Sequence, residues 1–431
     1  MDPFVARRAR LLTSIEGVAI VPSAPVTIRN HDVEHPYRQD SDFYYLTGFE
    51  EPESGLLLST VHEEHRAVLF VRPRDREKET WDGSRVGVEG AVERFGVDAA
   101  FPIGELAKRL PRYLKGADQL HFHLGRQARL DQTILEAIER TRERGRNPRG
   151  WPQRIVHPEL SWHEMRLFKD AGELDTMRRA AEITAESHLR AMVATKPGMY
   201  EYEVESVLRD TFLKRGARRV AYGPIVGSGP NACVLHYRDN DRRMKDGELL
   251  LIDAGCEYRY YASDVTRTFP VNGSFSPPQR AVYEVVLEAQ RRAIEACKPG
   301  TTIKGIHDVT VQALTEGMVE IGLLEGDVDA LLKEETYKRY ALHRTSHWLG
   351  LDVHDVGLYF KQGESRAVAP GLVFTIEPGL YIREDDEEAP ERFRGIGVRI
   401  EDDILITKGG YEVLTEGVPK APDEVERACR S

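Results

Sequence analysis

The 431-residue sequence contains only four cysteines, and none of them forms a CxxC pair: Cys233, Cys256, Cys297 and Cys429. This scarcity argues against a disulfide framework and against a thiolate zinc site, and it predicts a reducing, cytoplasmic location. No segment approaches the ~20 apolar residues that span a bilayer, and Glu16 interrupts any signal-peptide-like stretch. Positive charge is in deficit, since the formal net charge is −11. We therefore expect neither nucleic acid nor a membrane as a partner.

The length is enough for two domains, and 41% hydrophobic residues supply ample core material. We expect the domains to be residues 1–168 and 169–431. In the first, strand-like and helical runs alternate, which predicts an α/β domain with a mixed sheet. The strand-like runs are Gly17–Val21, Gly55–Ser59, Ala67–Arg72 and Leu120–Leu124, and the helical runs are Val5–Leu12, Glu105–Leu110 and Gln132–Arg142. The arginine-rich stretch Arg142–Arg154 is predicted to be a loop near the boundary.

The second half has longer helical periodicity, interrupted by Pro197-Gly198 and Pro299-Gly300. It predicts four helices, at 171–194, 200–215, 277–296 and 303–321, with short strands between and after them. The expected fold class is therefore α/β (α+β).

Five metal-binding residue types occur in the second half, each inside a segment that resembles a buried strand. They are Asp253, Asp264, His347, Glu377 and Glu401. Acids and imidazoles are costly to bury unless something pairs with them. Four carboxylates and one histidine that converge in an apolar frame therefore predict a bound cation, and four negative charges suit two divalent ions.

Asp253 and Asp264 are separated by ten residues. Two short strands joined by a tight turn near Tyr258-Arg259 would run antiparallel, and side chains on neighbouring strands lie ~5 Å apart. The alternative for either aspartate alone is a turn residue at a strand end. The pair, followed by one histidine and two glutamates, favours a metal site.

Three histidines, His343, His347 and His354, fall in one twelve-residue stretch that is too apolar for a solvated loop. Glu377 lies in LVFTIEPG, a strand-to-turn pattern. For Glu401, which belongs to an acidic run, a surface position is the alternative.

Oxygen donors with one imidazole suit Mn²⁺, with Co²⁺ and Zn²⁺ as competitors. Two ions ~3.5–4 Å apart lower the pKa of a shared water and stabilise both partners of a displacement. This donor set predicts hydrolysis rather than redox chemistry or group transfer.

The chain resembles the pita-bread metallopeptidases, and its short sequence motifs are most similar to those of aminopeptidase P. The resemblance rests on the order Asp, ten residues, Asp, His, Glu, Glu and on five motifs: YRQDSDFYYLTGFEEPES from Tyr37, HEMRLFKDAGELDTMRRAAEIT from His163, GPNACVLHY ending at Tyr237, SHWLGLDVHDVG from Ser346 and EPGLYI from Glu377. It implies an amino-terminal creatinase/aminopeptidase-P-like domain and a pita-bread catalytic domain. The implied activity is metal-dependent hydrolysis of the first peptide bond in peptides with proline at the second position.

The resemblance also implies roles for the metal ligands. Asp253 would bind one ion, His347 and Glu377 the other, and Asp264 and Glu401 would bridge the two. Glu377 would in addition move a proton during attack of the activated water.

Other positions match residues around the reaction centre of that family. His236 and His354 would be catalytic, His343 would receive the proline side of the substrate, and Arg399 would support the bridging carboxylates. Tyr381 would contribute to an aromatic wall for the proline ring. A surface ion pair for Arg399 and a structural hydrogen bond for His236 are the alternatives from the residues alone.

In that family the leading domain associates with neighbouring subunits, which implies a homodimer or homotetramer. Asp42 and Trp81 resemble positions that approach a partner's site. Prolidase, which cleaves only dipeptides, has the same metal ligands and stays an alternative. A non-catalytic scaffold usually lacks a ligand, creatinase has lost them, and methionine aminopeptidase generally lacks so long a leading domain.

Overall fold

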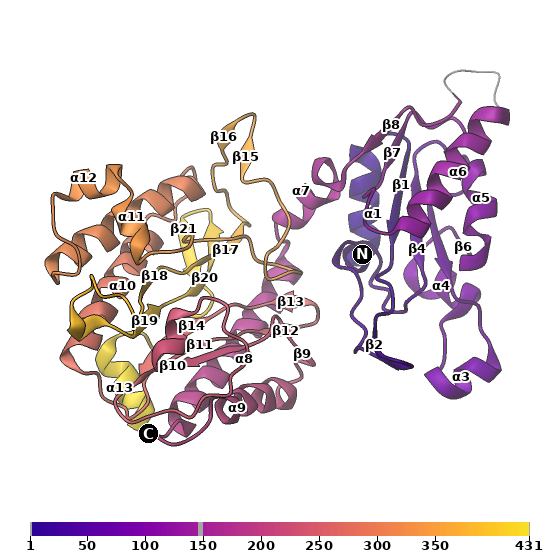
Figure 1. The fold of residues 1–431 in the computed structure, drawn as a ribbon. Coiled ribbons are helices and arrows are strands. Elements are labelled where there is room, and N and C mark those ends of the chain that lie inside the picture. The colour runs from indigo at the N-terminus through magenta and orange to yellow at the C-terminus, as the bar shows by residue number, and fades with distance from the viewer. Residues whose placement is uncertain (1, 145–149, 431) are drawn as a thin grey trace. The chain divides into compact units, whose positions relative to one another are not determined.

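The computed structural model describes residues 2–144 and 150–430, and the chain divides into two compact units, Met1–Arg166 and Leu167–Ser431 (Figure 1). Residues 145–149 of the predicted loop Arg142–Arg154 lie outside the described part. The rest of that stretch includes the end of a helix at Arg144 and the start of a strand at Arg154.

The amino-terminal unit is built on a mixed six-stranded sheet with the order β6-β5-β4-β1-β7-β8. Its strands are β1 (Val18–Pro22), β4 (Gly55–Ser59), β5 (Ala67–Val71), β6 (Ala99–Pro102), β7 (Gln119–His121) and β8 (Arg154–Val156). Strand β4 runs antiparallel to both of its neighbours, and the other pairs are parallel. The predicted mixed sheet is confirmed, although the sequence pattern missed β6 and β8. A separate hairpin joins β2 (Ile28–Asn30) and β3 (Val33–Glu34).

The described part of this unit also contains α-helices, several of which lie beside the sheet (Figure 1). They are α1 (Pro3–Ser14), α2 (Ser41–Thr47), α3 (Arg76–Asp82), α4 (Gly87–Phe95), α5 (Leu106–Leu114), α6 (Ala128–Arg144) and α7 (Trp162–Leu167). Apolar side chains of α5 and α6, such as Leu110 and Ile134, pack against Val18 and Phe70 of the strands. This packing buries one face of the sheet and supplies the main stabilisation of the unit.

Asp42 is buried in this unit rather than exposed to a partner. Its carboxylate accepts hydrogen bonds from Arg166 at 2.6 Å and His163 at 2.9 Å, which hold α7 against α2. Burial opposes ionisation, but Arg166 and His163 outweigh it and hold the pKa of the Asp42 carboxyl well below its usual range. Asp42 is thus bound within its own unit, whereas Trp81 is 85% exposed. The approach of these two residues to a partner's site stays a prediction.

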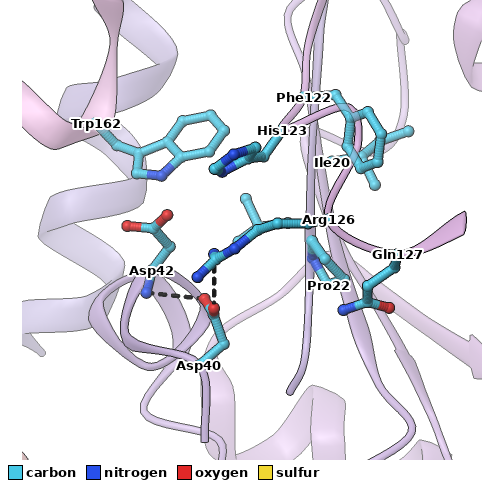
Figure 2. Close-up of a pocket in the computed structure, with 10 residues that line it drawn as sticks. Ile20, Pro22, Asp40, Asp42, Phe122, His123, Arg126, Gln127 and Trp162 are labelled. Atoms are coloured by element: carbon cyan, nitrogen blue, oxygen red, sulfur yellow. Dashed lines mark hydrogen bonds and ion pairs between the residues drawn. The ribbon is translucent and has the colours of Figure 1, made fainter. Parts of the chain in front are cut away.

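Figure 2 shows Asp42 beside Trp162, with Arg126 paired to Asp40 at 3.0 Å. The cavity between these side chains measures about 10 Å³. That is room for about one water molecule. A peptide does not fit there.

The carboxy-terminal unit contains two successive halves, each with a pair of long helices and a set of short strands (Figure 1). The first half holds α8 (Ala171–Ala194), α9 (Glu201–Lys214), β9 (Arg219–Val220), β10 (Ile225–Ser228), β11 (Leu249–Asp253), β12 (Cys256–Tyr258), β13 (Tyr261–Ala262) and β14 (Thr266–Pro270). The second holds α10 (Pro277–Glu295), α11 (Ile303–Glu320), β17 (Val373–Ile376), β18 (Gly379–Ile382), β19 (Ile396–Arg399), β20 (Asp402–Thr407) and β21 (Gly410–Val413). The remaining elements are α12 (Val328–Lys333), β15 (Phe360–Lys361), β16 (Glu364–Ser365) and α13 (Pro422–Arg430).

The four predicted long helices are confirmed within two residues at each end. Helix α8 begins with a capping box in which Asp170 and Glu173 satisfy each other's backbone N–H groups. Helices α10 and α11 pack closely, since a Cβ at Gly317 would lie 2.5 Å from Val285 Cγ1. Within the described residues, no helix combines the length and the apolar character needed to cross a bilayer.

Candidate metal centre

The five predicted ligands lie where short strands end, rather than inside strands as expected. Asp253 is the last residue of β11, and Glu377 directly follows β17. Asp264 lies in the link between β13 and β14, His347 precedes an isolated bridge, and Glu401 lies between β19 and β20. A regular strand turns successive side chains to opposite faces. Irregular backbone at the strand ends instead lets side chains from separate segments point to one place.

Asp253 and Asp264 are brought together by antiparallel pairing of β11 with β14, in which Asp253 is opposite Thr266. The expected tight turn is present, with Arg259 at φ 48° and Tyr260 at φ 74° between β12 and β13. The approach also requires a glycine after the first ligand. A Cβ at Gly255 would lie 1.7 Å from the carbonyl oxygen of the residue before Asp264.

Asp264, His347 and Glu401 form the tightest group. One ligand atom from each lies within 4.8 Å of the other two. His347 Nε2 lies 3.4 Å from Asp264 Oδ2 and 3.5 Å from Glu377 Oε1. The other ring nitrogen of His347, Nδ1, is 3.1 Å from the Trp348 carbonyl oxygen, to which it donates. That hydrogen bond places a proton on Nδ1 and leaves Nε2 as the ring nitrogen that would bind a cation once its own proton is lost.

Hydroxyl groups orient the carboxylates. Tyr222 donates to Asp253 at 2.5 Å and also to Asp264. Thr266 Oγ1 donates to Glu401 Oε2 at 2.7 Å, and the Glu401 N–H donates to the Thr266 carbonyl at 3.1 Å. Neither Tyr222 nor Thr266 was identified as a site residue from the sequence, because tyrosines and threonines near strands are common and nothing in their spacing distinguishes these two.

Three of the carboxylates, those of Asp253, Glu377 and Glu401, have raised pKa values because they are buried together. Burial is the main cause for Asp253, Glu377 and Glu401, and repulsion from neighbouring carboxylates adds to it, so that the pKa of Glu377 rises to about 7. Although burial opposes protonation of His347, its contacts with Asp264 and Glu377 raise its pKa to about 9. Such a surplus of buried negative charge fits one or more bound cations.

Arg399 is part of this network and only 4% exposed, so the surface ion pair alternative is wrong. Its guanidinium donates to Asp253 Oδ2 at 2.6 Å, to the Tyr381 hydroxyl at 2.8 Å and to Thr266 Oγ1 at 3.0 Å. Arg399 thus supports Asp253 directly and reaches Glu401 through Thr266.

Tyr381 in turn lies 2.7 Å from His343 Nε2, and His343 Nδ1 lies 2.9 Å from its neighbour's carbonyl oxygen. Nδ1 therefore carries the proton and Nε2 accepts from Tyr381. Burial lowers the pKa of His343 to about 4, which keeps this imidazole neutral. Trp348, which directly follows His347, is fully buried and stacks on Tyr359.

His354 and His236 are exposed. The His354 ring packs edge-to-face against His347 with centroids 4.4 Å apart. Burial and the nearby His347 lower the pKa of His354, and His236 contributes to this lowering and to that at His343. The structure therefore brings all the predicted site residues into one region, with His236 at its exposed border.

Two family models match the chain. Residues 175–408 match metallopeptidase family M24, and residues 4–122 match the aminopeptidase P amino-terminal domain. The chain belongs to metallopeptidase family M24, with the domain arrangement of aminopeptidase P. The expected family, the fold class and the enzyme class of metallo-aminopeptidase are thereby confirmed.

Relatives match over almost the whole length. The Xaa-Pro aminopeptidase of Escherichia coli K12 is 46% identical over 98% of this chain and 96% of its own, and that of Haemophilus influenzae is 44% identical over 99% and 96%. Among solved structures, the aminopeptidase PepP of Pseudomonas aeruginosa superposes with a TM-score of 0.96 at 49% identity, covering 99% of this chain and 97% of that one. A zinc-substituted aminopeptidase P of Escherichia coli in complex with product gives a TM-score of 0.95 at 45% identity, with 99% and 97% coverage.

Proposed function

We propose that this protein is an Xaa-Pro aminopeptidase that removes the first residue from peptides with proline at the second position. The observation that carries the proposal is the convergence of Asp264, His347 and Glu401, whose ligand atoms lie within 4.8 Å of one another. Full-length similarity to proteins named Xaa-Pro aminopeptidase supports the substrate class. The enzyme works, in this proposal, with two divalent ions, most readily Mn²⁺, with Co²⁺ or Zn²⁺ as substitutes.

The resemblance to the family supports the ligand assignment. Asp253 would bind one ion, His347 and Glu377 would bind the other, and Asp264 and Glu401 would bridge the two. When bound, the two ions supply Lewis-acid polarisation of the scissile carbonyl and activation of a water.

The surrounding side chains exchange a proton, contact the substrate and stabilise the intermediate. Glu377 Oε1 lies 3.5 Å from His347 Nε2, so its carboxylate would be placed to exchange a proton with a water held at the metal centre. The neutral His343 presents a polar edge to the substrate's proline side, while Arg399 and Tyr381 hold it in place. His354 and His236 lie at the open side, where the substrate carbonyl and the tetrahedral intermediate would be stabilised.

Proline explains why such an enzyme is needed. A peptide bond before proline has no N–H, and the ring fixes φ. Peptidases that depend on that N–H fail on this bond, so a site that relies on metal ions and side chains is an effective alternative.

We further propose that residues 1–168 select substrates and form subunit contacts, that residues 169–431 carry the chemistry, and that the enzyme is a cytoplasmic homodimer or homotetramer. The exposed Trp81 of α3 supports a subunit contact. The free thiols of all four cysteines support a reducing compartment. Light scattering on the purified protein tests the assembly, and a monomer would overturn it.

The direct test of the activity compares two substrates on chelator-treated protein with Mn²⁺ added back. Release of arginine from Arg-Pro-Pro, with little cleavage of the dipeptide Ala-Pro, is the expected result. Arg-Ala-Pro, which moves proline by one position, is the matched control and should stay intact. Cleavage of Ala-Pro alone would identify a prolidase, and no cleavage of any peptide would favour a non-catalytic scaffold.

A further inference from the structure

A buried ion pair lies close to the metal centre but includes none of its ligands. Lys169 Nζ is 3.0 Å from Asp355 Oδ2, and both side chains are 1% exposed. Lys169 also donates to the carbonyl of Leu167 at 3.3 Å. A buried ion pair contributes little net stability, because the loss of hydration offsets the attraction. The position of the pair in the fold therefore matters more than its net contribution to stability.

Asp355 directly follows His354 and closes the loop that carries it. The Asp355 N–H donates to the Trp348 carbonyl at 2.9 Å, and inside the loop the Gly350 N–H donates to the carbonyl of residue 352 at 3.1 Å. His347 lies just before this closed loop and His354 at its end, so the loop sets the edge-to-face contact of the two imidazoles. A shift of Asp355 moves His354 with it.

The ion pair also packs against the backbone of this loop. A Cβ at Gly350 would lie 2.1 Å from Asp355 Oδ2 and 2.9 Å from Lys169 Cε, so only glycine fits there. The Gly350 carbonyl accepts a hydrogen bond at 2.8 Å from Ala262, two residues before Asp264. The loop is thereby anchored at its middle as well as at its end.

Lys169 is itself fixed to the strand that leads to Glu377. Its N–H donates to the Gly371 carbonyl at 2.9 Å, two residues before β17 begins. The loop is attached to the same strand, since the Leu349 N–H donates to the Val373 carbonyl at 3.1 Å. Strand, loop and lysine therefore form one hydrogen-bonded unit around the buried charges.

We propose that Lys169 and Asp355 are positioning residues, whose ion pair holds the loop 348–355 so that His354 faces the metal centre. The inference rests on the proposed function, because its readout is hydrolysis of an Xaa-Pro bond. Neither residue touches the substrate. They affect the rate of hydrolysis through the position of the His354 imidazole.

The first test is Lys169→Met, which keeps most of the side-chain volume and removes the charge. A displacement of about 1 Å at a reacting group lowers a rate by up to ~100-fold, so we expect kcat for Arg-Pro-Pro to fall about 10- to 100-fold. KM and bound Mn²⁺ should change little. Lys304→Met is the matched control, since Lys304 pairs with Asp308 on the exposed face of α11, and it should keep wild-type kcat.

A double-mutant cycle separates positioning from a general structural effect. In a His354→Ala background, adding Lys169→Met should cause no further loss of kcat, because the group to be positioned is already gone. A further loss as large as in the wild-type background would overturn the proposal.

If Lys169→Met does not fold, the charge-free pair Lys169→Met/Asp355→Leu and the milder Asp355→Asn replace it in the same cycle. Wild-type kcat in a folded variant of either residue would contradict the proposal. Failure of the wild-type enzyme to cleave Arg-Pro-Pro would instead refute the proposed function. An active wild type with an equally active Lys169→Met refutes the positioning role alone.

Discussion

Replacing Arg267 by methionine removes the most heavily bonded buried cation beside the metal centre. Its guanidinium is fully buried and donates to four backbone carbonyls and to Asp402 at 2.7 Å. The four carbonyls belong to Thr266 at 3.0 Å, Glu401 at 2.6 Å, Val418 at 2.9 Å and Pro419 at 3.1 Å. Arg267 therefore joins β14, the Glu401 segment and the region after β21.

The expected loss in the free energy of unfolding follows from the number of these bonds. Each lost hydrogen bond to a carbonyl costs about 1 kcal/mol net, which gives about 4 kcal/mol. Breaking the buried pair adds about 3 kcal/mol, the low end of the usual range, because Lys420 still pairs with Asp402 at 2.6 Å. Burial of the methionine side chain recovers about 2 kcal/mol. We expect a net destabilisation of about 5 kcal/mol, a large part of the stability of a typical domain.

Thermal unfolding of the full chain measures this loss. At roughly 2–4 °C per kcal/mol for a domain of this size, Tm should fall by about 10–20 °C. Arg280→Met is the matched control, because the Arg280 side chain is 39% exposed and pairs only with Glu284 and Asp423 among the described residues. It should shift Tm by at most a few degrees. A Tm for Arg267→Met as close to wild type as that of the control would refute the reasoning.

Three further outcomes are expected. Tyr222→Phe, which removes the hydroxyl that orients Asp253, should lower activity or Mn²⁺ affinity about 10- to 100-fold in a metal titration, and wild-type affinity would contradict this. Burial lowers the pKa of His188 from 6.5 to about 4. Because the folded state resists protonation of this imidazole, its contribution to stability is complete above pH 6.5, and about 3 kcal/mol is lost by pH 4. His188→Gln should therefore show a weaker loss of stability over that pH range in urea unfolding. Gly255→Ala should abolish metal binding or folding, since its Cβ would overlap the Ser263 carbonyl, and normal bound Mn²⁺ would show that the two strands can separate there at little cost.

The long helices of the second unit could be predicted because their apolar positions repeat over many turns between Pro-Gly breaks. Helix α8, for example, covers Ala171–Ala194 as expected. The short strands β6 and β8 could not, since three or four residues give no recognisable alternation and their place depends on pairing with distant strands.

The convergence of acids with a histidine was predictable, because buried acids in apolar segments need compensation. The position of these residues relative to the strands was not predictable, because Asp264 and Glu401 lie in links between strands. Tyr222 and Thr266 escaped notice because their hydrogen bonds to carboxylates depend on tertiary contacts. Asp42 looked like a contact residue, but folding pairs it with Arg166, which is 124 residues away in sequence.

The most direct test of the central claim is a metal titration of chelator-treated wild-type protein, in which bound Mn²⁺ and the rate of Arg-Pro-Pro hydrolysis are measured on the same samples. We expect no activity without metal, two ions bound per chain at saturation, and loss of activity together with an ion in Glu401→Ala. Hydrolysis by the metal-free protein, or undiminished hydrolysis by the Glu401→Ala variant, would contradict it.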